Sequence, residues 1–104
     1  MKIVYHTEKF DIGEAMRRLE ANKKVARTGW NGKGMYLFIV RPNDIKDEHM
    51  LDIGEDHGET WDLPQDPVVC MKNAQNRVTI GWLASQVDLF AKDFVEVTIE
   101  HVAS

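Results

Sequence analysis

Two short segments of the sequence place a tryptophan beside glycine and beside side chains that carry amide or hydroxyl groups. The first segment spans residues 29–37, and the second spans residues 81–86. An indole ring offers a flat face on which a planar group can stack, and neighbouring amides and hydroxyls can orient that group. This combination is the chemistry of a nucleobase pocket. The candidate ligand contacts in the two segments are Trp30, Asn31, Trp82, Ser85 and Gln86.

Each of these residues also has a purely structural interpretation. Both tryptophans can belong to the core, since tryptophan is usually well buried. Asn31 can serve only to form a turn, and Gln86 can be a solvated helix position. Stacking one base on an indole contributes roughly 1–3 kcal/mol, which is enough to anchor a nucleotide. Three cations can neutralise a phosphate, although each can also be an ordinary surface charge: Arg27, Lys33 and Lys72.

Signatures of catalysis or metal binding in the sequence are weak. The four histidines have no metal-ligand spacing, and a single cysteine excludes a thiolate zinc site. Residues 52–58 are rich in oxygen ligands but do not match the register of a calcium loop. The sequence around Lys33 lacks the glycine spacing and the hydroxyl residue of a P-loop, and Ser85 has no histidine nearby in the sequence. We therefore expect a binding protein without catalytic residues, metal ligands or a cofactor.

Length and composition favour one small domain, which we predict to cover residues 1–104. With 43% hydrophobic and 29% charged residues the chain is typical of a folded protein, and its small core favours oligomerisation. Cys70 lies in an apolar run and is expected to be a core residue rather than a reactive thiol. No apolar stretch approaches the ~20 residues needed to span a membrane, and the N-terminus is not a signal peptide. We expect a cytoplasmic protein that binds no membrane.

Acidic residues are concentrated in one part of the chain. Between Arg41 and Asp66 there are nine acids and two bases, a net charge of -7, whereas the remaining eight acids and eleven bases give the rest of the chain +3. We interpret residues 41–67 as a solvated loop on a mildly basic body that can hold a small anion. The body lacks the clustered basic face of a protein that binds a nucleic-acid polymer.

Two helices are predicted from caps and spacing. Asp11 is a natural N-cap, the apolar side chains over residues 12–19 follow helical spacing, and Asn22 suits the C-terminal end. Ser85 can cap a second, short helix near residues 85–91. Asp88 then stands at its third position, where a carboxylate takes up free backbone amides.

Strands are predicted before, between and after these helices, and together the elements give an α+β fold with a mainly antiparallel sheet. The dipeptide Asn31-Gly32 is of the kind that closes tight hairpins, so the strands around residues 25 and 37 should pair antiparallel. Residues 94–99 alternate apolar and polar side chains, which predicts a strand buried on one face. The expected strands are residues 1–5, 25–28, 35–40, 68–72, 77–80 and 94–99.

Four sequence motifs resemble a phage protein family. They are AMRRL at residues 15–19, KKVAR at 23–27, GWNGKGMYL at 29–37 and WLASQVDLFAKDF at 82–94. The family is the second Thoeris anti-defence family, long catalogued as a domain of unknown function in phages and prophages. The resemblance covers residues 10–97 in order and is interrupted by residues 41–67, a loop that is variable in the family.

The resemblance implies a protein that sequesters nucleotide immune signals without cleaving them. Family members bind cyclic ADP-ribose isomers made by bacterial TIR-domain proteins, and some also capture cyclic di- or trinucleotides. They form homotetramers with ligand pockets at subunit interfaces, so the implied partners are a small nucleotide and further copies of the chain. The ligand-binding residues implied here are Trp30 and Trp82 as stacking or pocket-wall residues, Asn31, Ser85 and Gln86 as polar contacts, Arg27 and Lys72 as phosphate or ribose contacts, and Asp88 as a ligand contact or a helix-start residue.

Two other classes of function stay open at this point. A nucleotide-processing hydrolase would use the acidic loop as a metal site. A phage structural or assembly protein would use its aromatic edges as subunit contacts. Which nucleotide is preferred depends on the acidic loop if that loop borders the pocket.

Overall fold

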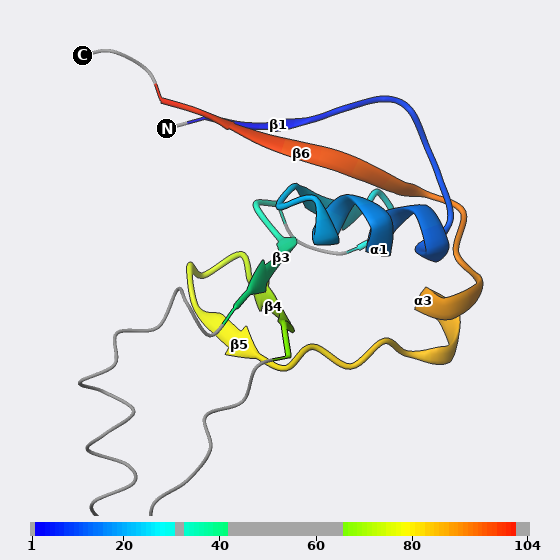
Figure 1. Cartoon of the computed structure of the whole chain (residues 1–104). Helices are drawn as coiled ribbons and strands as arrows, with labels where there is room; N and C mark the ends of the chain where they lie inside the picture. The colour runs from blue at the N-terminus through cyan, green and yellow to red at the C-terminus, as the bar shows by residue number, and fades with distance from the viewer. Residues whose placement is uncertain (1, 31–32, 42–65, 102–104) are drawn as a thin grey trace, which may run out of the picture.

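The computed structural model describes residues 2–30, 33–41 and 66–101, and in these ranges the chain forms a six-stranded sheet and two helices (Figure 1). The α+β prediction is therefore confirmed. The acidic residues 42–65 lie outside the described residues. In chain order the elements are β1 (Lys2–Tyr5), α1 (Ile12–Glu20), β2 (Lys24–Arg27), β3 (Tyr36–Val40), β4 (Val68–Lys72), β5 (Val78–Ile80), α3 (Gln86–Phe90) and β6 (Phe94–Glu100).

The sheet has the order β1-β6-β2-β3-β4-β5, and every neighbouring pair is antiparallel. Val25 of β2 pairs with Leu37 of β3, which confirms the predicted pairing of these two strands. The Asn31-Gly32 turn that was expected to join them lies outside the described residues. The first and last strands of the chain pair with each other, so β6 is an interior strand between β1 and β2.

Both helices begin and end as their sequences predict. The side chain of Asp11 accepts a hydrogen bond of 3.0 Å from the Glu14 backbone N–H, and the chain leaves α1 through Asn22 with a left-handed φ of 65°. Ser85 and Asp88 form a reciprocal capping box at the start of α3. No helix in the described part of the chain is long and apolar enough to cross a membrane.

One face of the sheet packs against α1, and we call it the helix face. Its central cluster joins two residues of α1 to one residue from each of three neighbouring strands. This cluster is buried almost completely and fixes the helix across β2, β3 and β6. Its members are Ala15, Leu19, Val25, Leu37 and Phe94.

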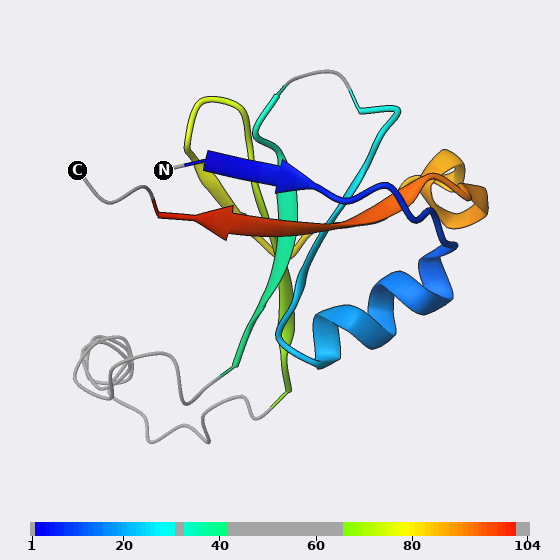
Figure 2. The ribbon, with the colours of Figure 1, turned by 90° about the horizontal axis from the view of Figure 1, so that it is seen from above.

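The opposite face, which we call the inner face, is enclosed by the curvature of the sheet itself. Seen from above, β1 and β6 cross β3 and β4 steeply (Figure 2). Ala26, Cys70 and Val95 are buried, at 1%, 0% and 0% exposure. Because side chains alternate along a strand, Ala26 and Val95 point away from the helix-face residues Val25 and Phe94. The core position predicted for Cys70 is confirmed.

Burial along β6 differs from the sequence prediction. Alternation predicted a strand buried on one face, yet Phe94 and Val95 are both fully buried although they point to opposite faces. The physical reason is the interior place of β6. At its start the helix-face cluster covers one side and the curved sheet covers the other.

Candidate functional site

The two predicted tryptophans meet on the helix face. The ring centroids of Trp30 and Trp82 lie 6.2 Å apart with an angle of 64° between the ring planes, and Trp30 stands edge-on to Phe94 at 6.4 Å. Both indoles are half-buried and pack against the helix-face cluster. The structural interpretation of these residues as core therefore holds in part, since both pack against the core cluster but neither is fully buried.

Backbone turns at the ends of two strands set the position of each indole. Trp30 follows β2, and its N–H donates to the Arg27 carbonyl at 3.3 Å. Trp82 follows β5, and its N–H donates to the Val69 carbonyl at 2.7 Å. Gly81 has a φ of 87° at this turn, a conformation that favours glycine. The glycine before Trp82 thus lets the chain leave β5 and bring the indole back toward β4.

A nearly buried carboxylate, that of Asp88, ties the first indole to α3. Its Oδ1 accepts hydrogen bonds from Arg27 Nη1 at 2.8 Å and from the indole Nε1 of Trp30 at 3.2 Å. Its Oδ2 accepts from the backbone N–H and the hydroxyl of Ser85, each at 2.9 Å. Burial alone would raise the pKa of Asp88, but the hydrogen bonds from Arg27, Ser85 and Trp30 outweigh it and lower that pKa. Asp88 is 7% exposed and serves as a helix-start residue.

The Arg27 guanidinium lies between two carboxylates. Besides its bond to Asp88, its Nε donates to Asp93 Oδ1 at 2.8 Å, and its side chain is 14% exposed. The other oxygen of Asp93 accepts from the Thr28 hydroxyl at 3.1 Å and from the Gly29 N–H at 2.8 Å. These bonds, Asp93 first and Asp88 second, raise the pKa of Arg27. Arg27 thus has a structural part in holding the segment that leads to Trp30.

Asp93 was missed at the level of sequence. Burial tends to raise its pKa, but Arg27, Gly29 and Thr28 together lower it below the ordinary value. Its partner Arg27 lies 66 positions away in the chain, so no local spacing signals the pair. Asp93 directly precedes β6, and the Arg27 to Phe94 register of the sheet brings the two side chains together.

The other residues that the sequence predicted as ligand contacts do not all lie beside the indoles. The hydroxyl of Ser85 is engaged in the capping box, while Gln86 is exposed in the first turn of α3. Asn31 lies outside the described residues. Lys72 is on the inner face, since its neighbour Met71 packs against the helix-face cluster. The structure thus joins Arg27, Trp30, Trp82, Ser85 and Asp88 and sets Lys72 apart from them.

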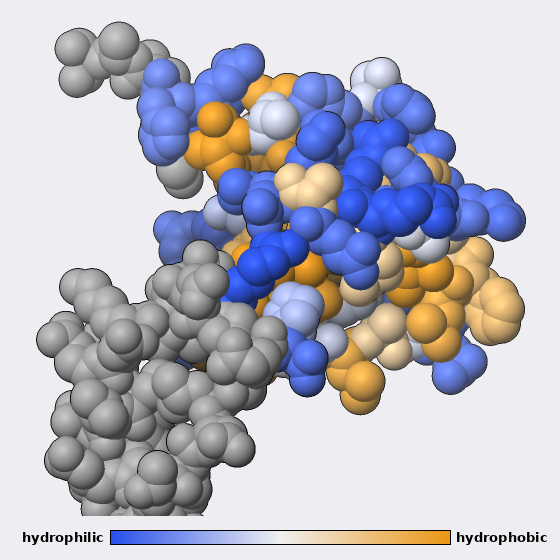
Figure 3. Space-filling view, viewed as in Figure 1, coloured by the Kyte–Doolittle hydropathy of each residue, from blue (hydrophilic) through white to orange (hydrophobic). Residues whose placement is uncertain are grey.

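Large apolar side chains lie exposed around α3 and the segment before it. Figure 3 shows apolar surface gathered over α3. The exposed fractions are 90% for Leu83, 68% for Val87, 43% for Leu89 and 79% for Phe90. Exposed apolar side chains that gather in one region mark a contact surface more often than scattered ones do. We call these four residues the α3 patch.

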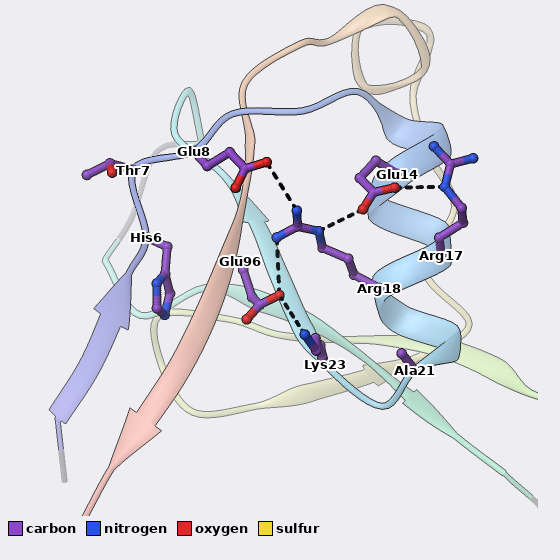
Figure 4. A pocket seen from close by; sticks show the side chains of 9 residues that line it. All are labelled: His6, Thr7, Glu8, Glu14, Arg17, Arg18, Ala21, Lys23 and Glu96. Carbon is purple, nitrogen blue, oxygen red and sulfur yellow. Dashed lines mark hydrogen bonds and ion pairs between the residues drawn. The ribbon is translucent and has the colours of Figure 1, made fainter.

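A cavity of about 670 Å³ lies on another part of the surface, between α1 and β6 (Figure 4). Arg18 is its centre and reaches Glu14 at 3.0 Å, Glu96 at 3.2 Å and Glu8 at 3.4 Å, while its guanidinium lies 4.1 Å from the centroid of the Phe10 ring. This arrangement joins α1 to the sheet and leaves little net charge for a ligand. The arginines and lysine of this cavity, each within 3.6 Å of a carboxylate oxygen, are Arg17, Arg18 and Lys23.

Histidine, cysteine and carboxylate side chains form no group of three or more that could hold a metal ion within residues 2–30, 33–41 and 66–101. The oxygen-rich residues 52–58 lie outside these ranges.

Two comparisons with known proteins identify the family of this chain. The family model described as the Thoeris anti-defense 2-like domain matches residues 10–97, which include both indoles and the Arg27, Asp88 and Asp93 network. The chain is also 33% identical over 87 residues to the protein named Thoeris anti-defense 2 from Bacillus phage SP01, in a match that covers 83% of this chain and 92% of the phage protein. The chain therefore belongs to the Thoeris anti-defense 2-like family, and this membership supports a role in phage anti-defence.

Proposed function

We propose that this protein binds and sequesters a nucleotide immune signal, a cyclic ADP-ribose isomer or a related cyclic oligonucleotide, without cleaving it. It would act in the cytoplasm of the host bacterium as a homo-oligomer, a homotetramer in the family to which it belongs. The observation that carries the proposal is the half-buried pair of indoles, whose ring centroids lie 6.2 Å apart. Asp88 holds the Trp30 indole in place, and its charge is paired with that of Arg27.

The angle between the indoles suits a ligand with one planar base. Rings at 64° form a corner, so a base that stacks on one ring presents its edge toward the other. The indole Nε1–H of Trp30 already donates to Asp88, which fixes the ring before a ligand binds and reduces the ordering cost of binding. Gln86 and Asn31 supply amide groups for the base edge or the ribose in this proposal.

The α3 patch supports assembly with further copies of the chain. It is formed by α3 and the segment that carries Trp82, so a second subunit seated on it would border the indoles. β5 is also an edge strand with all three residues exposed, which offers free backbone groups to a partner. A pocket completed by a second subunit would account for indoles that stay partly open in a single chain.

Calorimetric titration with a cyclic ADP-ribose isomer tests the binding site. We expect a dissociation constant between about micromolar and nanomolar for the wild type. Trp30→Ala and Trp82→Ala should each abolish capture, whereas Phe38→Leu, an aromatic substitution elsewhere in the sheet, should leave it unchanged. If both tryptophan variants fold and bind at full affinity, the site is wrongly assigned.

Heating the complex and identifying the released molecule separates binding from catalysis. Recovery of intact ligand supports sequestration, whereas recovery of a hydrolysed product supports a nucleotide-processing enzyme. The absence of heat with every nucleotide tested would instead favour a phage assembly protein.

Light scattering tests the subunit contact. The oligomer of the Leu83→Asp variant should dissociate into smaller species, whereas that of Lys9→Asp, a control at another exposed position, should stay intact.

A further inference from the structure

Asp93 contacts each of the three residues that lead to Trp30. Its Oδ1 accepts from Arg27 Nε at 2.8 Å, and its Oδ2 accepts from the Thr28 hydroxyl at 3.1 Å and from the Gly29 N–H at 2.8 Å. Its backbone carbonyl also accepts from the Thr28 N–H at 3.1 Å. Four donors from three consecutive residues therefore converge on one residue that directly precedes β6. We call Arg27, Thr28, Gly29 and Asp93 the Asp93 cluster.

The close approach of Asp93 to the main chain explains the glycine before Trp30. A Cβ on Gly29 would lie 2.9 Å from Asp93 Oδ2, so a side chain there would push the carboxylate away from the N–H that it accepts from. The glycine before Trp82 has a different reason, because a Cβ on Gly81 would meet nothing within 4 Å and its φ is 87°. The Asp93 contact is therefore specific to the first indole.

The Trp30 ring is fixed at two points that share one network. Its backbone follows directly from the Asp93 cluster, and its N–H donates to the Arg27 carbonyl at 3.3 Å. The ring nitrogen Nε1 donates to Asp88 at 3.2 Å, and Arg27 joins the two carboxylates at 2.8 Å from each. Phe94, the residue after Asp93, meets the indole edge-on at 6.4 Å. Asp93 thus holds the main chain and, through Arg27, the carboxylate that orients the ring.

We infer that Asp93 is a positioning residue for ligand capture, one that sets the place of the Trp30 indole without touching the ligand. The inference rests on the proposed function. Both side-chain oxygens of Asp93 are used inside the protein, so its effect on a ligand passes through the ring. If the ring spends less time in the position that binds, the apparent affinity falls in proportion to that fraction.

Asp93→Asn tests this role with little change of shape. An asparagine amide has one acceptor oxygen and one donor nitrogen, whereas both oxygens of Asp93 accept. Either orientation of the amide therefore sets its NH₂ group against a donor, the Arg27 Nε or the Gly29 N–H. We expect capture of the cyclic ADP-ribose isomer, measured by calorimetric titration, to weaken about tenfold or more. Capture at full affinity by the folded variant would overturn the inference.

A matched variant separates positioning from stability. Val97 is 2% exposed and lies on the inner face with Val95, so Val97→Ala removes buried methyl groups without touching the Asp93 cluster. A loss of stability alone weakens capture only by the fraction that is unfolded, which is negligible while the protein stays largely folded. Val97→Ala should therefore be less stable in urea and still capture at wild-type affinity. Equal losses of affinity in both variants would overturn the inference.

Binding kinetics separate positioning from direct contact. A positioning residue changes the fraction of molecules that can bind, so its loss slows association and leaves dissociation unchanged. Stopped-flow indole fluorescence measures both rate constants. For Asp93→Asn we expect association about tenfold slower and dissociation within about twofold of the wild type. Faster dissociation with unchanged association would mean that Asp93 contacts the ligand and would overturn the positioning role.

Gly29→Ala disturbs the same contact from the opposite side. It keeps the charge of Asp93 but displaces the carboxylate, so it should weaken capture as Asp93→Asn does. This variant decides the question if Asp93→Asn does not fold. Gly13→Ala in α1, where the nearest atom to a Cβ is at 3.4 Å, is the control and should capture as the wild type does. Full affinity in a folded Gly29→Ala protein would contradict the inference.

The indole N–H signal of Trp30 tests the positioning without a ligand. The chain has three tryptophans, and the signal that disappears in Trp30→Ala identifies this one. In the wild type the bond to Asp88 should slow exchange of this proton with solvent, and in Asp93→Asn exchange should be about tenfold faster. Unchanged exchange in the folded variant would overturn the inference. Failure of the wild type to capture the cyclic ligand would contradict the proposed function alone.

Discussion

Two arginines, Arg27 and Arg18, organise different regions of the molecule, and each is surrounded by carboxylates. Arg27 binds Asp88 and Asp93 at 2.8 Å each, and its side chain is 14% exposed. Arg18 binds three glutamates at 3.0 to 3.4 Å; its side chain is 21% exposed, and that of Glu8 is 77% exposed. The first network holds the Trp30 segment against α3, whereas the second holds α1 against β6.

The difference lies in what each carboxylate does besides pairing. Asp88 and Asp93 also accept hydrogen bonds from an indole, a hydroxyl and backbone N–H groups, so their positions determine local backbone geometry. The glutamates around Arg18 contact Arg17, Arg18 and Lys23, which are surface cations. A shielded ion pair whose carboxylate also accepts backbone hydrogen bonds fixes the local backbone, whereas a more exposed ion pair mainly orients a helix on the sheet.

The largest expected effect comes from Arg27→Ala. It leaves two shielded carboxylates without their cation and should lower the free energy of unfolding by about 3 kcal/mol. Urea denaturation measures this loss. Arg27→Lys should fall between the alanine variant and the wild type, because one ammonium cannot replace the planar guanidinium between both aspartates. An alanine variant within measurement error of the wild type would contradict the role given to this network.

Gly29→Ala should be next in size. A Cβ at this position would lie 2.9 Å from Asp93 Oδ2 and 3.3 Å from Arg27 Nη2, so the network would have to shift, at a cost of about 2 kcal/mol. Gly13→Ala is the matched control in α1, where the nearest atom is at 3.4 Å. Gly13→Ala should instead stabilise the protein by about 0.5 kcal/mol, because alanine has a higher helix propensity than glycine. Thermal unfolding of both variants checks the contrast, and equal effects would argue against crowding at Gly29.

Acid should weaken the Arg27 network. The pKa values of Asp88 and Asp93 lie below the ordinary value of 3.8, so in acid the unfolded chain binds protons before the folded one does. The stability that the two ionised aspartates contribute is fully present above about pH 4, and it is lost as the pH falls through their lowered pKa values. Stability should fall by at most about 1.4 kcal/mol per pH unit for each aspartate. Urea titrations from pH 7 to pH 2.5 measure the slope, which should be shallower in Asp93→Asn; an unchanged slope would exclude Asp93 as its source.

Arg18→Ala should have the smallest effect, a loss of about 1 kcal/mol in the free energy of unfolding, because two of its three partners, Glu8 and Glu14, are more exposed than either aspartate and solvent screens them. Ligand capture by the indoles should be unchanged. Denaturation together with calorimetric titration checks both statements. A loss as large as that of Arg27→Ala would show that exposure does not separate the two networks.

The sequence predicted most elements because their signals are local. Asp11, Asn22 and Ser85 mark helix ends through caps that involve only nearby residues. The pairing of the strands that contain Val25 and Leu37 was predicted from the Asn31-Gly32 dipeptide between them. The similar surroundings of Trp30 and Trp82 identified them as candidate ligand contacts, but no spacing predicted that the two rings meet.

Contacts between residues far apart in the sequence could not be predicted from such local signals, because they depend on how the strands pair and how the sheet curves. The separation of Lys72 from the indoles follows from strand alternation once the register is known. The pairing of Arg27 with Asp93 and the hydrogen bond from the Gly34 N–H to the Tyr5 hydroxyl join residues 66 and 29 positions apart. Such contacts depend on the non-local register, which no short motif encodes.

Because the single carboxylate of Asp88 serves a helix start, a guanidinium and an indole, substitutions at positions 27, 30, 85 and 88 should be strongly epistatic. Glutamate there would move the oxygens by one methylene and disturb all three partners at once, and asparagine would set an amide against the guanidinium. Evolutionary change at one of these four positions should therefore require compensating changes at the others.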